Sequence, residues 1–298
     1  MNETKRRSLR GMVCTTVGGV CWGVSGTCGQ YLFSRYGVGP LWLTCVRLLA
    51  GGALLTLLAL PRHGTAILGI FKSRRDALQL VCYGVFGLLL CQYAYMTAIS
   101  WSNAATTTVL QNLGLVLIML YTCLRGRRPP SWREALALAL ALAGIYLLAT
   151  GGNPAHMVLS PQGLFWGLAA AVAVALYSLL PRQLLSRWEQ SAITGPGMLI
   201  GGAAVNLAAR SWNFSVSLPV QGWLAVAAVV LLGTALAFSL IMQGVADIGP
   251  VKSSMLAATE PVSATVLSAL WLGTSFSPAD LIGFAAILAT IFLLAKAE

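Results

Sequence analysis

The sequence predicts an all-α polytopic membrane protein with ten transmembrane helices arranged as two inverted five-helix repeats. Three observations lead to this fold class. The 298 residues are 57% hydrophobic and only 9% charged, whereas a soluble domain is about 25% charged. Ten apolar runs are long enough to cross a hydrocarbon core of about 30 Å, which takes about 20 helical residues. The two halves of the chain also carry these runs in the same order.

The ten apolar runs are joined by short polar or turn-forming segments, so consecutive helices are expected to be antiparallel neighbours. The alternation typical of a membrane β-strand is absent from them. The predicted spans are 11–34, 40–60, 77–99, 103–124, 132–149, 161–180, 191–210, 220–241, 250–272 and 278–295.

Weak internal similarity divides the chain into two units. Residues 31–36 (Tyr-Leu-Phe-Ser-Arg-Tyr) correspond to residues 183–188 (Gln-Leu-Leu-Ser-Arg-Trp). A duplicated unit with an odd number of spans inserts its second copy in the opposite orientation, as in many secondary transporters. We therefore predict a cytoplasmic N-terminal tail at 1–10, a first five-helix repeat at 11–149, a linker at 150–160 and a second, inverted repeat at 161–295.

Lysine and arginine gather at alternating helix ends, and this predicts that both termini are cytoplasmic. The segment 62–75 and the turn at 125–133 are rich in Arg and Lys, whereas the other side has only Arg35 and Arg210. Loops at corresponding positions of the two halves differ in charge, as an inverted repeat requires. The net charge of +11 therefore reflects topology, and we expect a bacterial plasma (inner) membrane protein that contacts the lipid bilayer and no nucleic acid.

The sequence lacks the patterns of catalytic and metal sites. The two histidines, His63 and His156, have no ligand partner at metal spacing, and the seven cysteines show no CxxC pair. No paired carboxylates and no nucleophile–base arrangement can be recognised. We expect no metal, no cofactor and no enzymatic activity.

Two charged residues lie well within predicted spans, and both are candidates for function. A charge in hydrocarbon costs at least about 2.5–3.5 kcal/mol on insertion scales. Arg47 and Glu260 therefore each need an oppositely charged partner, contact with water or a functional role. One interpretation is an ion pair that holds their helices together. In the other, both face a cavity, where Glu260 binds a cationic group or a proton and Arg47 has a structural or gating role or binds a carboxylate. Pro261 interrupts the helical ladder beside Glu260, which predicts a broken or gating helix.

Several large polar or amphipathic side chains lie deep in other spans. Buried amides and hydroxyls need hydrogen-bond partners, which are either neighbouring helices or a ligand. With Glu260, the candidates for a substrate-binding cavity are Trp22, Gln92, Tyr95, Asn112 and Tyr177.

Two GxxxG patterns, at Gly19 and Gly23 and at Gly197 and Gly201, predict close approach of helix backbones. Packing within one chain is the simpler interpretation, and a homodimer is the alternative.

Four motifs resemble the EamA-type members of the drug/metabolite transporter superfamily: residues 21–25 (Cys-Trp-Gly-Val-Ser), Pro40 with Arg47, Thr259-Glu260-Pro261, and residues 278–283 (Pro-Ala-Asp-Leu-Ile-Gly). Departures occur at Arg127 and Thr274, where members often carry an acidic residue, and at Gly114, where many have proline. The resemblance implies two EamA-like repeats and a central cavity lined mainly by helices 1, 3, 4, 6, 8 and 9. It also implies alternating access by rocking of the two halves.

We therefore predict a secondary transporter that moves a small metabolite, an amino acid or a similar compound, outward across the plasma membrane. An importer of choline-like amines is the alternative, followed by a channel or a membrane-embedded enzyme. Proton coupling through Glu260 is left open, as are the identity of the substrate and the oligomeric state.

Overall fold

Helices make up most of this structure, a computed structural model that describes residues 3–154 and 156–295. No strand occurs within those ranges. The helices of the first half are α1 (Glu3–Tyr36), α2 (Pro40–His63), η1 (Gly64–Lys72), α3 (Arg74–Cys82), η2 (Tyr83–Leu89), α4 (Leu90–Trp101), α5 (Ala104–Gln111), α6 (Gly114–Arg125) and α7 (Trp132–Thr150). Those of the second half are α8 (Pro161–Leu179), α9 (Arg182–Leu185), α10 (Gln190–Ala209), η3 (Ser211–Asn213), α11 (Val220–Val230), η4 (Leu231–Leu236), α12 (Ala237–Ile248), α13 (Pro250–Ala257), α14 (Thr259–Leu272) and α15 (Pro278–Ala295).

Nine helical segments of the described residues are long and apolar enough to cross a membrane. They begin at α2 and end with α15, and several join consecutive elements, such as α3, η2 and α4. The 34-residue helix α1 is not among the nine. It packs along α12 and α14 and also contacts α5, α11 and α13. Because much of its surface faces protein, α1 can carry Gly, Ser and Thr where lipid-facing helices carry larger apolar residues. The predicted count of ten spans stays a prediction.

The described part of the predicted N-terminal tail is helical. Residues 3–10 continue α1, and two of their arginines have a partner in α12. The Arg10 guanidinium donates two hydrogen bonds of 2.8 Å to the Asp247 carboxylate at the end of α12, and Arg7 donates a third of 3.2 Å. These contacts fix the start of α1 against α12.

Two of the predicted spans are interrupted, one without a signal in the sequence and one beside Pro261. The fourth predicted span is divided into α5 and α6 at Asn112, whose side-chain amide donates to the Thr108 carbonyl at 2.8 Å and so competes with the helical ladder. The ninth is divided into α13 and α14 at Ala258. Here Pro261 has no N–H to offer the Ala257 carbonyl one turn earlier.

Two further spans contain a π-helical turn, η2 in the first half and η4 in the second. Both lie in the middle of a long span, between α3 and α4 and between α11 and α12. A π-helical turn shifts the backbone hydrogen-bond register and frequently marks a functional site.

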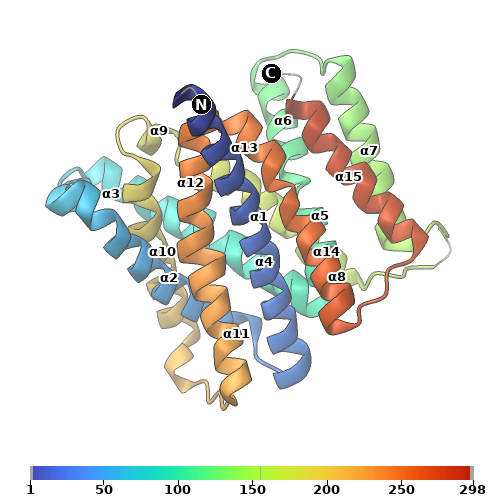
Figure 1. Ribbon diagram of the computed structural model, residues 1–298, viewed down its shortest axis with the longest axis horizontal. Coiled ribbons are helices and arrows are strands. Elements are labelled where there is room, and N and C mark those ends of the chain that lie inside the picture. The colour runs from blue at the N-terminus through green and yellow to red at the C-terminus, as the bar shows by residue number, and fades with distance from the viewer. Residues whose placement is uncertain (1–2, 155, 296–298) are drawn as a thin grey trace.

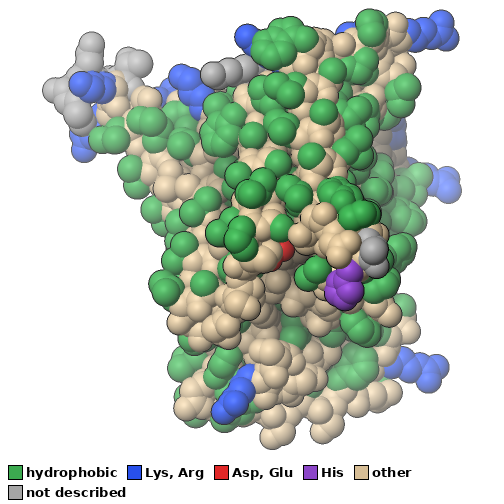
Figure 2. All heavy atoms as spheres, turned by 90° about the vertical axis from the view of Figure 1, so that its right-hand side faces the viewer, with side chains coloured by type: hydrophobic (Ala, Val, Ile, Leu, Met, Phe, Trp, Pro, Cys, Tyr) green, Lys and Arg blue, Asp and Glu red, His purple; other side chains and the backbone are tan. Residues whose placement is uncertain are grey.

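The helices pack in pairs that bring distant parts of the chain together (Figure 1). The strongest pairings join α2 to α10, α7 to α15, α1 to α12 and α14, and α4 to α8. Figure 2 shows a face dominated by hydrophobic side chains and backbone, with the visible Lys and Arg near its ends and edge. Ion pairs of the described residues lie where α1, α3, α7 and α10 begin and where α2, α6, α9 and α12 end, which is one side of the bundle.

We predict that Gly23→Ala destabilises the fold. A Cβ at Gly23 would lie 2.8 Å from the Glu260 carbonyl oxygen and 2.9 Å from the Ala264 nitrogen, so α1 and α14 would have to separate. Overpacking of this kind costs about 1–3 kcal/mol. Gly39→Ala is the matched control, because nothing lies within 4 Å of its Cβ. Thermal unfolding in detergent should show a lower melting temperature for Gly23→Ala alone, and equal melting temperatures would contradict the packing.

Candidate functional site

A cavity of about 330 Å³ lies between the two halves of the chain. Its walls come from α1, α2, α4, α5, α8, α12, α13 and α14, with smaller contributions from η2, α6 and α10. All six predicted substrate-binding residues line it, together with Arg47: Trp22, Gln92, Tyr95, Asn112, Tyr177 and Glu260. Pro261 does not line it and is buried in the first turn of α14. The structure therefore brings the candidates together, and their role in binding stays a prediction.

Arg47 is held in the wall of the cavity by the π-helical turn η4. Its Nε donates to the Thr234 hydroxyl at 3.1 Å, and its Nη2 donates to the Gly233 carbonyl at 3.0 Å. The residue is only 3% exposed, and its Nη1 is buried without a hydrogen-bond partner. Gly51, one turn further along α2, makes room for the Thr234 side chain. A buried donor without a partner is costly, and Nη1 of Arg47 is such a donor.

Glu260 lines the same cavity from the first turn of α14, immediately after the break at Ala258. It is partly exposed. Within the described residues its carboxylate makes neither an ion pair nor a side-chain hydrogen bond. The interpretation that Arg47 and Glu260 form an ion pair is therefore wrong for this structure: Arg47 is engaged with η4 instead. One cavity thus holds a guanidinium and a carboxyl group that are not bonded to each other.

Gln92 adds an uncharged polar group beside these charges. Its side chain lines the cavity and is 8% exposed, yet its amide makes no hydrogen bond within the described part of the chain. Most buried side-chain amides are hydrogen-bonded. The Gln92 amide is therefore available to water or to a ligand.

One end of the cavity is sealed by polar contacts between helices. The Tyr95 hydroxyl lies 2.9 Å from the Thr108 hydroxyl and joins α4 to α5. Beyond it, the Gln30 side-chain oxygen accepts from the Ala104 backbone N–H at 2.8 Å and from the Ser268 hydroxyl at 3.1 Å. Gln30 therefore ties α1 to the start of α5 and to α14.

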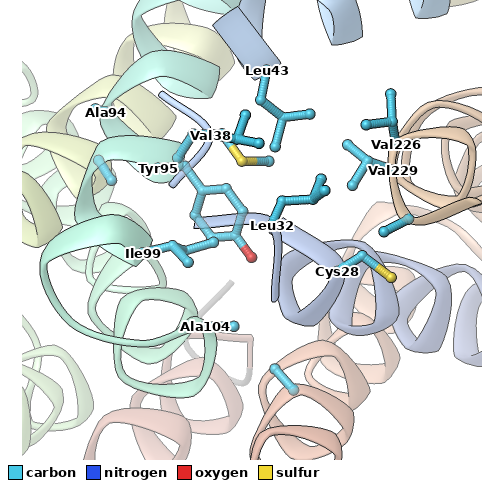
Figure 3. Close-up of a cluster of buried hydrophobic side chains, with 14 residues drawn as sticks. Cys28, Leu32, Val38, Leu43, Ala94, Tyr95, Ile99, Ala104, Val226 and Val229 are labelled. Carbon is cyan, nitrogen blue, oxygen red and sulfur yellow. The ribbon is translucent and has the colours of Figure 1, made fainter. Parts of the chain in front are cut away.

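A hydrophobic cluster surrounds this sealed end (Figure 3). The ring of Tyr95 lies among Leu32 of α1, Leu43 of α2 and Ile99 of α4, with Val226 and Val229 contributed by α11. Leu32 and Leu43 are fully buried. The cluster closes the cavity with side chains from both halves of the chain.

The opposite end of the cavity is accessible. Its lining there includes Gln190 at the start of α10, Val245 near the end of α12 and the exposed Ser254 of α13. These positions lie on the side of the bundle that carries the ion pairs. The cavity therefore opens toward the end of the molecule where the chain begins.

Aromatic and apolar side chains form the rest of the wall. Trp22 packs edge-on against Phe238 with ring centroids 5.5 Å apart. Tyr177 stacks on Tyr83 at 5.7 Å, and its hydroxyl accepts from the Gln190 side-chain amide at 3.4 Å. These contacts fix the orientation of the rings that face the cavity.

Sequence reasoning missed some residues of this site. Thr234 and Gly233 hold Arg47, but within an apolar run they look like ordinary packing residues. Cys91 also lines the cavity; it lies four residues before the predicted Tyr95 on the same helix, and this spacing was the available signal. Among the described residues, no group of three or more His, Cys, Asp and Glu is placed to hold a metal ion.

The fold and the cavity define a polytopic helical membrane protein with a partly polar chamber between its halves. The model of the EamA-like transporter family matches residues 9–150 and 161–296, and the chain belongs to this family.

Proteins of similar sequence are also described as transporters. The chain is 37% identical to the uncharacterized inner membrane transporter YicL of Salmonella typhimurium, over 96% of this chain and 95% of the relative. It is 23% identical to the uncharacterized transporter YwfM of Bacillus subtilis, over 93% and 90%. A crystal structure 22% identical over 98% of both chains has a TM-score of 0.64, which supports the fold. The protein is therefore a multi-pass transporter of the bacterial inner membrane.

We predict that Thr234→Val lowers stability, because valine keeps the shape of threonine but leaves the buried Nε of Arg47 without its acceptor. The cost of an unsatisfied buried donor is about 1–3 kcal/mol. Thr234→Ser keeps the hydroxyl and serves as the control. Thermal unfolding should separate the two variants, and a Thr234→Val protein as stable as wild type would show that the contact does not hold Arg47.

Proposed function

We propose that this protein is a secondary transporter that exports a small zwitterionic metabolite, such as an amino acid, by alternating access. The proposal includes ten spans, with α1 as the tenth, in two inverted five-helix repeats. The observation that carries it is the presence of opposite charges, Arg47 and Glu260, on the walls of one cavity without a bond between them. A ligand with both charges would satisfy both walls at once.

The side chains that line the central cavity support a zwitterionic substrate. The unpartnered Nη1 of Arg47 and the free amide of Gln92 suit a carboxylate, since charge-assisted hydrogen bonds to guanidinium are strong. Glu260 suits an ammonium group. Leu88, Phe238 and Met242 leave an apolar surface for a side chain, and the volume of about 330 Å³ suits a small molecule.

The position of the opening supports export. Positive residues mark the cytoplasmic side, and the cavity opens where the Arg-rich helix ends and the ion pairs lie. Substrate would enter from the cytoplasm, while the cluster around Tyr95 closes the outer side. Both termini are cytoplasmic in this proposal. Among the described residues, Glu260 alone brings a carboxylate to the cavity wall, so it is also the candidate for proton coupling.

An importer of choline-like amines is the second candidate. Trp22, Tyr95 and Tyr177 lie around the cavity that holds Glu260, and aromatic faces attract cations. Arg47 argues against it, because an amine without a carboxylate would leave this buried cation uncompensated.

Binding assays with charge-neutralised variants separate the two candidates. We expect a zwitterionic substrate to bind both Glu260→Gln and Arg47→Gln about 30-fold more weakly than wild type, since loss of one buried charge partner costs about 2 kcal/mol or more. An amine would lose affinity only for Glu260→Gln. The measurement is isothermal titration against a panel of amino acids and amines, in samples whose melting temperature matches wild type. Zwitterion binding that neither variant weakens would refute the proposed site.

The same Glu260→Gln variant also tests proton coupling, through the pH dependence of transport. In liposomes, a pH gradient should accelerate uptake by wild type but not by the variant. Gradient-driven transport that survives in Glu260→Gln would assign the coupling elsewhere.

The side of the opening can be tested with single cysteines in a background without the seven native ones. Ser254→Cys, at the accessible end of the cavity, should react with a charged, membrane-impermeant maleimide in inside-out vesicles. Ser34→Cys, exposed near the end of α1 on the other side, should react in right-side-out vesicles. The reverse pattern would invert the proposed topology and with it the direction of loading.

A further inference from the structure

A second hollow, of about 530 Å³, lies on the outside of the bundle between α1, α13, α14 and α15. Apart from Lys252 and Thr259, its lining is apolar: Met12, Met255, Leu256, Ala258, Val262, Leu288 and Phe292. The Thr259 hydroxyl is already engaged with the Thr16 and Leu256 carbonyls, at 3.2 and 2.9 Å. We refer to this hollow as the outer groove.

The outer groove is separate from the central cavity, although the two are close in sequence. Ala257 and Glu260 line the cavity, whereas Ala258 and Thr259 line the groove. The segment where α13 ends and α14 begins therefore separates the groove from the cavity. A molecule in the groove would contact both helices on either side of this break.

Of the residues that the structure describes, Lys252 is the charged one that lines the outer groove. It lies in the first turn of α13 and is exposed. Within the described part of the chain it makes no ion pair and no side-chain hydrogen bond. Its helix end is on the side of the bundle that carries the ion pairs, where the headgroups of the cytoplasmic leaflet would lie.

We propose that the outer groove binds an anionic phospholipid of the cytoplasmic leaflet, with an acyl chain along the apolar lining and the phosphate against Lys252. The groove runs along segments long and apolar enough to span the membrane, so hydrocarbon is the medium that fills it. Basic positions at the cytoplasmic ends of membrane helices attract anionic headgroups. A single lysine matches a single phosphate, which favours phosphatidylglycerol over a lipid with several phosphates. This site is independent of the transported substrate.

Native mass spectrometry of the detergent-purified full chain tests the proposal, with phosphatidylglycerol and phosphatidylcholine added in turn. We expect preferential retention of phosphatidylglycerol. Lys252→Gln should weaken it about fivefold, the effect of one Lys near a headgroup, without changing phosphatidylcholine. Lys72→Gln, which removes an exposed lysine far from the groove, is the control for charge.

A second pair of variants tests the apolar part. Val262→Trp should fill the groove and reduce retention of both lipids, whereas Val266→Trp, one turn further along the exposed face of α14, should not. The site would be overturned if Lys252→Gln and Lys72→Gln reduced the retention of phosphatidylglycerol equally. It would also be overturned if the two Trp variants reduced lipid retention equally. A dimer that Val262→Trp dissociates would likewise overturn it, because the occupant would then be a second copy of the chain.

Discussion

Within a bilayer, every backbone N–H and C=O group must find its partner inside the protein, and the irregular parts of this structure follow from that requirement. The breaks at Asn112 and Ala258 and the turns η2 and η4 lie beside the central cavity or a tightly packed neighbouring helix. The clearest case is η4, where the π-helical register leaves the Gly233 carbonyl to accept from Arg47. The freed backbone carbonyl and the buried guanidinium thus supply each other's hydrogen-bond partner.

The two π-helical turns pack against their neighbouring helices in different ways. Where η2 crosses α10, glycines bring the backbones together: a Cβ at Gly84 would lie 2.5 Å from the Gly197 carbonyl oxygen, and one at Gly201 would lie 2.5 Å from that of Gly84. Where η4 crosses α2, Arg47 fills the corresponding region. A close backbone crossing leaves no space for a ligand, whereas the guanidinium of Arg47 keeps one nitrogen without a hydrogen-bond partner. In the proposed transporter, the first crossing would therefore serve packing and the second would contribute a group for substrate.

The sequence revealed those residues of the site that are unusual in a membrane helix, namely charges and a proline. Arg47 and Glu260 stand out because charges are rare in apolar spans, and Pro261 correctly indicated an interruption of its helix. The matching break at Asn112 was missed, since it depends on a side-chain hydrogen bond to the Thr108 carbonyl and not on proline. The sequence also gave no sign of the contact that Arg10 at the start of α1 makes with Asp247, more than 200 residues away in the chain. Contacts of this kind depend on three-dimensional packing, which a single sequence does not display.

The separation of Arg47 from Glu260 also bears on how the proposed transporter would avoid futile cycling. While the cavity is open, water can solvate Glu260 and compensate part of the charge of Arg47. Closing an empty cavity would remove that water and leave two desolvated charges, which is strongly unfavourable unless each is paired. A zwitterion supplies a partner for both at the moment of closure. The unpaired charges would thus make the occluded state accessible mainly when substrate is bound, because the ligand must interact more favourably with that state than with the open one to shift the equilibrium.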